Sequence, residues 1–289
     1  MKIALAYSPF NNNDAVLVKA QALIKILKPE SIEVVYVASP SESALSLAFD
    51  VPAKIRFSEY PKTEIAKKLT KAGFKYDRIT VLNVDSVSMS QQALELSKFL
   101  KRKKFDFTII ATHARKGLDR FFQGSFAESM LLNHQSPLLV FNPRSKIPKS
   151  ISKILFGSDL SKVAGKNLAT TYKIAKKLKS KIDVLYISEA VYKGIDTTGM
   201  LYAQAYQGIY EGRKAQLEAQ IKKVDPKMNY IIDSSWAAMS EIFLKQAQKN
   251  KTDLIVMNSK INPLIAALGG SVTRQVIRAS ELPVLVLVG

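Results

Sequence analysis

The chain has 289 residues, of which 47% are hydrophobic and 23% are charged, which is typical of a folded globular protein and too apolar for a disordered one. It contains no cysteine and only two histidines, which excludes disulfides, thiolate metal sites and cysteine nucleophiles and argues against a multi-histidine metal site. The net charge of +19 favours anionic partners, but the basic excess is shared evenly, with 22 basic and 13 acidic residues in 1–146 and 21 and 11 in 147–289.

In the first half, apolar runs of strand length alternate with helical patterns. Strands are predicted at 3–6, 33–37, 78–82, 107–111 and 138–141, with helices between them. The runs are continuously apolar, which predicts strands buried on both faces, as in a parallel sheet built from βαβ units. The segment 142–150 holds two prolines among polar residues and is interpreted as a linker.

The second half repeats the alternation. Strands are predicted at 153–157, 182–187, 229–232, 254–257 and 284–288, and helices at 163–179, about 201–224, 237–248 and 271–279. We therefore expect two domains, at 1–144 and 150–289, of the α/β class, each with a doubly wound, five-stranded parallel sheet.

An internal repeat supports this division. Gly124-Ser125 and Gly270-Ser271 are 146 residues apart, and each pair precedes a short helix, a proline and an apolar final strand. A Gly-Ser pair at the start of a helix offers free N–H groups, the positive end of the helix dipole and a hydroxyl, which together suit a phosphate. In a doubly wound sheet, ligands bind at the carboxyl ends of the strands, where these loops lie.

The loop at 111–118 reads Ala-Thr-His-Ala-Arg-Lys-Gly-Leu, and Gly124-Ser125 follows it. This resembles the loop of nucleotide-binding members of the universal stress protein family, which carry Gly, two residues, Gly, nine residues, then Gly and Ser or Thr. Alanines stand here in place of the first two glycines. Members of that family also place an Asp at the end of the first strand, near the adenine. The second half keeps this acid in Asp159-Leu160-Ser161, whereas the first half has Ser8-Pro9-Phe10.

The resemblance covers nearly the whole chain as two tandem copies. It implies an adenine-nucleotide alpha-hydrolase-like fold, with the two domains paired within the chain by pseudo-two-fold symmetry, and it leaves a homodimer open. It further implies a cytoplasmic, non-catalytic or weakly catalytic stress-response protein in which at most one half binds ATP or AMP, with Mg²⁺ if the ligand is ATP, and no other cofactor. We expect neither a membrane nor a nucleic acid as partner. The expected nucleotide-binding residues are His113, Arg115, Gly124, Ser125, Asp159, Gly270 and Ser271.

Three alternatives stay open. Gly and Ser are favoured at helix N-termini, so the Gly-Ser pairs and Asp159-Leu160-Ser161 could serve only as helix caps. A weak nucleotide hydrolase on the same scaffold would need a metal-binding acid, for which Asp119 is the candidate in the first-half loop. A charge-driven binder of nucleic acid or an anionic surface is the third, although the basic runs at 98–104 and 173–181 end predicted helices and are interpreted as solvated faces.

Overall fold

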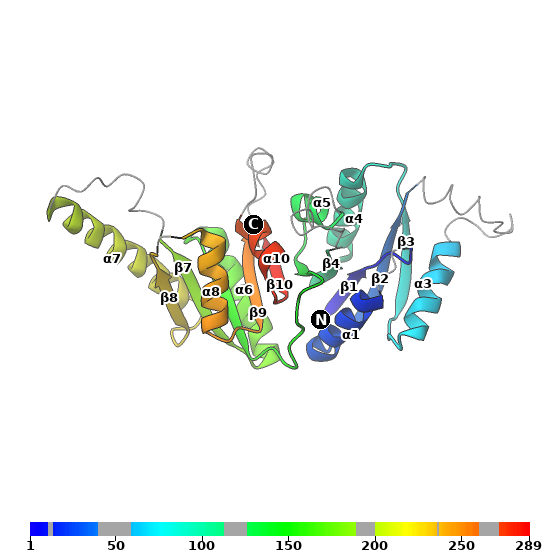
Figure 1. Ribbon diagram of the computed structural model, residues 1–289, viewed down its shortest axis with the longest axis horizontal. Coiled ribbons are helices and arrows are strands. Elements are labelled where there is room, and N and C mark those ends of the chain that lie inside the picture. The colour runs from blue at the N-terminus through cyan, green and yellow to red at the C-terminus, as the bar shows by residue number, and fades with distance from the viewer. Residues whose placement is uncertain (11–13, 40–58, 113–125, 189–199, 236, 260–271) are drawn as a thin grey trace. The chain divides into compact units, whose positions relative to one another are not determined.

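The structure is a computed structural model that describes residues 1–10, 14–39, 59–112, 126–188, 200–235, 237–259 and 272–289. The chain divides into two compact units, the first built mainly from Met1–Lys149 and the second from Ser150–Lys260 and Gly270–Leu287 (Figure 1).

The first unit is a parallel sheet with helices on both faces. Its strands follow one another in the order β3-β2-β1-β4-β5. The strands are β1 (Lys2–Ala6), β2 (Ser31–Ala38), β3 (Arg78–Asn83), β4 (Phe107–Ala111) and β5 (Leu138–Phe141). The helices are α1 (Asp14–Leu27), α3 (Glu59–Lys71), α4 (Met89–Lys103) and α5 (Phe126–Asn133).

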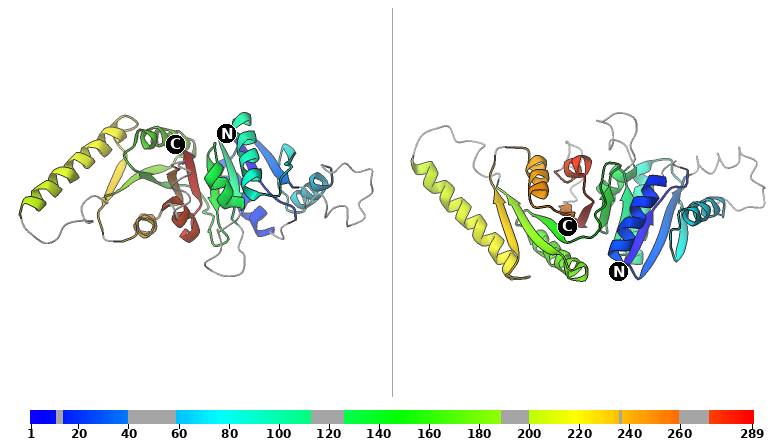
Figure 2. Two further views of the ribbon diagram at one scale, coloured as in Figure 1. Left: turned by 90° about the horizontal axis from the view of Figure 1, so that it is seen from above. Right: turned by 60° about the horizontal axis from the view of Figure 1, so that its bottom comes forward.

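The second unit has the same strand order, β8-β7-β6-β9-β10. The strands are β6 (Lys153–Ser158), β7 (Lys181–Ile187), β8 (Asn229–Asp233), β9 (Leu254–Ser259) and β10 (Val284–Val288). The helices are α6 (Lys162–Leu178), α7 (Met200–Lys222), α8 (Met239–Lys249) and α10 (Val272–Ala279). Helices α6 and α7 lie on one side of this sheet, and α8 and α10 lie on the other (Figure 2). The predicted α/β fold class is therefore confirmed, with five strands in the described part of each unit.

Burial explains the continuously apolar strands. The central strands β1, β4, β6 and β9 hold side chains with no more than a few per cent exposure, among them the fully buried Phe107 and Phe156. Helices on both faces cover these strands, so neither face alternates with polar residues. The edge strands β3 and β8 are only half-buried.

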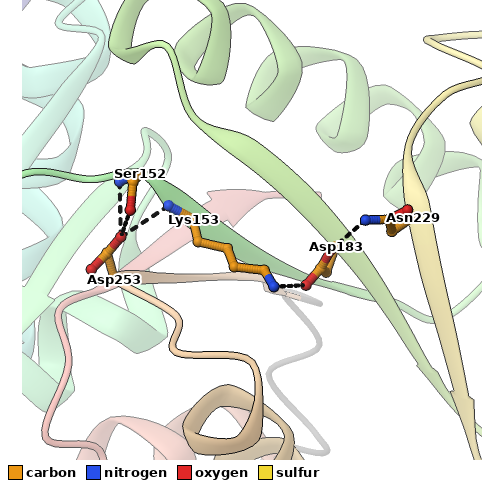
Figure 3. Close-up of polar contacts among 5 residues, drawn as sticks. All are labelled: Ser152, Lys153, Asp183, Asn229 and Asp253. Atoms are coloured by element: carbon orange, nitrogen blue, oxygen red, sulfur yellow. Dashed lines mark hydrogen bonds and ion pairs between the residues drawn. The ribbon is translucent and has the colours of Figure 1, made fainter.

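Carboxylates tie the amino ends of the strands together. Asp253, just before β9, accepts hydrogen bonds from the Ser152 hydroxyl and from the N–H groups of Ser152 and Lys153, at 2.6 to 2.9 Å (Figure 3). The Lys153 ammonium in turn lies 3.0 Å from the carboxylate of the buried Asp183 on β7. In the first unit, Asp106 accepts in the same way from the N–H of Lys2, at 2.6 Å. The carboxyl ends of the strands, at the other edge of the sheet, are not joined by these contacts and remain available for ligand binding.

No helix in the described part of the chain is long and apolar enough to cross a bilayer.

Candidate functional site

The strand order of the second unit reverses between β6 and β9, so the crevice beyond their carboxyl ends is where a doubly wound sheet binds ligands. Helix α6 begins after β6, and α10 begins after the loop that follows β9. The N-terminus of a helix carries partial positive charge and N–H groups that have no partner within the helix backbone. The position is therefore suited to an anionic ligand.

The turn from β6 into α6 is held by its own polar side chains. The Ser158 hydroxyl accepts from the N–H of Leu160 at 3.1 Å, and Asp159 Oδ1 accepts from the N–H of Ser161 at 3.0 Å. Ser161 then caps α6, because its hydroxyl accepts from the N–H of Ala164 at 3.1 Å. Leu160 has φ of 61°, a left-handed conformation that costs a non-glycine residue about 1 kcal/mol or more. The hydrogen bonds on both sides of Leu160 hold that conformation in place.

Gln220, on the neighbouring helix α7, forms hydrogen bonds with the same turn. Its Nε2 donates to the carbonyls of Leu160 and Ser161 at 2.8 and 3.0 Å, and its Oε1 accepts from the Ser158 hydroxyl at 3.2 Å. The position of the exposed Asp159 is thus set by a helix that is distant in sequence. Nothing in the local pattern around Gln220 marks this role.

Asn258, near the end of β9, links the elements around the crevice. Its Nδ2 donates to the carbonyl of Gly157 on β6 at 2.7 Å, and its Oδ1 accepts from Asn167 on α6 at 2.9 Å. Its backbone carbonyl accepts from the Thr273 hydroxyl in the first turn of α10, at 3.3 Å. Asn258 therefore brings the ends of β6 and β9 and the starts of α6 and α10 into one hydrogen-bonded network. In the sequence, Asn258 is recognisable only as an amide at the end of a predicted buried strand, and that position does not predict which residues it binds.

The first unit differs at the corresponding turn. After β1, the half-exposed Phe10 packs edge-on against Tyr36, with ring centroids 5.9 Å apart, and stacks on Tyr60 at 6.2 Å. The carbonyl of Pro9 accepts a hydrogen bond from the Lys68 ammonium. Ser8 stands at the position of Asp159 and Phe10 at that of Ser161, so this turn has an aromatic contact and no carboxylate.

Of the predicted nucleotide-binding residues, the structure places Asp159 at the carboxyl end of β6. The others lie outside the described residues: His113, Arg115, Gly124, Ser125, Gly270 and Ser271. Asp119, the candidate metal-binding acid of the hydrolase alternative, also lies outside them. Among the described residues, no group of three or more acidic or histidine side chains is placed to hold a metal ion. The interpretation of Asp159-Leu160-Ser161 as a helix cap is confirmed for Ser161, and Asp159 orients the capping residue.

Comparisons with known proteins agree with this fold. The chain resembles a universal stress protein from Archaeoglobus fulgidus, with a TM-score of 0.64 and 18% identity over 99% of this chain and 95% of that one. It also resembles a putative universal stress protein from Pseudomonas aeruginosa UCBPP-PA14, with a TM-score of 0.61 and 16% identity over 99% and 92%. A universal stress protein in complex with cAMP aligns with 48% of this chain and 97% of its own, with a TM-score of 0.35 and 18% identity.

No curated protein matches the sequence. The model of the universal stress protein family, however, matches the chain twice, at residues 1–142 and 150–287. These matches cover nearly the whole length, one in each unit. The chain belongs to the universal stress protein family and carries two tandem copies of its domain.

Proposed function

We propose that this tandem universal stress protein binds one adenine nucleotide, ATP or AMP, in its second domain. The observation that carries the proposal is Asp159, an exposed carboxylate held at the switch point by Ser161 and, through the turn, by Gln220. A carboxylate accepts about four hydrogen bonds, so the bond from Ser161 leaves capacity for an adenine amino group or a ribose hydroxyl. The first domain has Phe10 and no acid at this turn.

The phosphates would meet the start of α10. Gly270-Ser271 directly precedes Val272, the first residue of this helix. The N–H groups of a first helical turn and a serine hydroxyl suit a phosphate, and Arg274 adds a positive charge in that turn. The hydrogen bond from Thr273 to Asn258 supports this placement, because it fixes the first turn of α10 at the carboxyl end of β9.

Titration calorimetry with ATP and with AMP tests the proposal. Replacing Asp159 with Asn or Ser271 with Ala should weaken binding about tenfold each. The first change replaces an ionised acceptor by a weaker neutral one and the second removes a hydroxyl donor, and each effect is worth roughly 1–2 kcal/mol. Asp85→Asn, at an exposed acid after β3, serves as the matched control and should leave affinity unchanged. If Ser125→Ala weakens binding while the changes at Asp159 and Ser271 do not, the site lies in the first domain and the proposal is wrong.

We propose a binding module rather than an enzyme. A hydrolase needs a metal-binding acid and a positioned water at the phosphates, for which Asp119 is the candidate in the first domain. Millimolar ATP with Mg²⁺ should give no phosphate release above the buffer rate. Turnover that Asp119→Asn abolishes would establish the hydrolase alternative instead.

The role in stress tolerance, the pairing of the two domains within the chain, a homodimer and a cytoplasmic location stay predictions. The apolar final strands 138–141 and 284–288 support the intrachain pairing, since exposed apolar edge strands need a cover.

A further inference from the structure

Helix α6 has one strongly basic face. Five exposed lysines lie on it: Lys162, Lys166, Lys173, Lys176 and Lys177. At 3.6 residues per turn they fall within a sector of about 100°, opposite the buried Ala164, Leu168, Thr171 and Ala175. The helix contains no acidic residue. We call these five residues the lysine stripe.

The lysine stripe is largely uncompensated. Among the described residues, none of its ammonium groups forms an ion pair, and Lys176 lies 4.9 Å from the ring centroid of Tyr172. Two acids flank the helix. Asp159 precedes it and bonds Ser161, and Asp225 accepts from the Tyr172 hydroxyl and from the N–H of Lys227. The five positive charges of the lysine stripe therefore outnumber the two negative charges beside the helix.

The end of α7 extends the same basic surface. Gln220 contacts the start of α6 and Asp225 contacts its middle, so this segment runs beside α6 on one side of the sheet (Figure 2). Lys222, Lys223 and Lys227 are exposed there. Exposed lysines therefore occur on two neighbouring elements and are not confined to one helix end.

The duplicated fold shows that this charge is not needed for folding. Helix α1 occupies the position of α6 in the first unit, following the central strand β1 as α6 follows β6. It carries two lysines, Lys19 and Lys25, and one acid, Asp14. The same structural position is thus filled with nearly neutral charge in one unit and with the lysine stripe in the other.

We propose that the lysine stripe binds the phosphate backbone of duplex nucleic acid without regard to sequence. This differs from the expectation drawn from the even division of charge along the chain, which does not reveal that one helix face gathers it. From Lys162 to Lys177 the helix rises about 22 Å, a length over which duplex DNA presents about 13 phosphate charges. A lysine ammonium acts as a compact point charge, so each lysine of the stripe can contact a backbone phosphate without a fixed orientation.

The chemistry of the stripe disfavours the two nearest alternatives. A membrane-surface helix inserts large apolar side chains beside its lysines, and none of the exposed large apolar residues lies on α6. Binding of single strands relies on aromatic side chains that stack on bases. The aromatic residue of α6, Tyr172, is half-buried, and its hydroxyl is bonded to Asp225.

The proposal is tested by fluorescence anisotropy with the full chain and labelled 30-bp duplexes of two unrelated sequences, from 50 to 300 mM salt. A labelled 30-nucleotide single strand is measured in the same way, and co-sedimentation with anionic vesicles covers the membrane alternative. The test variant combines Lys166→Gln, Lys173→Gln and Lys177→Gln. The control variant combines Lys62→Gln, Lys71→Gln and Lys75→Gln, exposed positions on and after α3, and lowers the net charge equally. Circular dichroism and thermal unfolding confirm that both variants fold.

We expect wild type to bind both duplexes alike. The test variant should lose about 100-fold in affinity near 0.1 M salt, and its salt slope should be shallower by about 2.7, or 0.9 per lost phosphate contact. The control variant should change affinity less than about threefold. Four results would overturn the proposal: no binding at 50 mM salt, equal losses in both variants, stronger binding to a single strand, or stripe-dependent binding to anionic vesicles but not to DNA.

Discussion

Gly157 lies where α8 packs onto β6. A Cβ added there would come within 2.6 Å of a ring carbon of the buried Phe243, so the ring would have to shift within the core. Gly157→Ala should therefore lower the free energy of unfolding by about 1–3 kcal/mol, as overpacking of a core does. Gly208→Ala on α7, where a Cβ meets nothing within 4 Å, should raise it by about 0.5–1 kcal/mol through helix propensity. Urea unfolding of both variants measures the contrast, and equal effects would contradict this account of Gly157.

His134 makes stability depend on pH. It is fully buried at the end of α5, and its Nδ1 lies 2.8 Å from the carbonyl of Leu131. Burial lowers the pKa of His134 below the ordinary 6.5, and the bond to Leu131 opposes this only in part. Below about pH 6.5 the unfolded chain takes up a proton that the folded chain does not, so the free energy of unfolding falls as the pH falls.

His134→Asn should remove that dependence. Above pH 7 both states of the wild type are neutral at this residue, so the stability difference between wild type and variant should be constant. Below pH 6 it should shift in favour of the variant by up to about 1.4 kcal/mol per pH unit. Urea unfolding from pH 5 to 8 measures the shift, and parallel curves over the whole range would show that the folded state accepts the proton.

At the scale of elements, the hydrogen bonds of Gln220 hold α7 and the β6–α6 turn together. Gln220→Ala removes three hydrogen bonds and leaves the carbonyls of Leu160 and Ser161 without this donor, at a cost of about 1–3 kcal/mol. Gln216→Ala, one turn earlier, removes only an exposed bond from Arg213 and is the matched control. Hydrogen exchange at Leu160 and Ser161 should accelerate in the first variant alone. Unchanged exchange at these two residues would mean that the hydrogen bonds within the turn are sufficient to hold it without Gln220.

The elements were predictable where a local pattern specifies them. All ten strands appear where continuous apolar runs placed them, and α6 begins at the Ser161 cap. Helix α8 begins at Met239, two residues later than predicted, because the carbonyl of Ala238 is the first to accept helical bonds, from Glu241 and Ile242. The roles of Gln220 and Asn258 could not be predicted, because each depends on partners brought together only by the folded sheet.

At the scale of the whole molecule, duplication has produced two sheets of identical strand order with different chemistry at equivalent places. The turn after β1 has Ser8 where the second unit has Asp159, and it packs Phe10 on Tyr36 and Tyr60. Helix α1 is nearly neutral, whereas α6 carries the lysine stripe. Since the fold tolerates both versions, folding alone requires neither of them. One half is thereby proposed to carry the nucleotide site.

Native mass spectrometry of the intact chain with ATP or AMP tests that claim most directly, because it counts bound nucleotides per chain. With the nucleotide near the wild-type dissociation constant, the account predicts at most one nucleotide per wild-type chain and a clearly lower occupancy in Asp159→Asn, as binding about tenfold weaker requires. Two nucleotides per chain, none at all, or an undiminished occupancy in Asp159→Asn would contradict it.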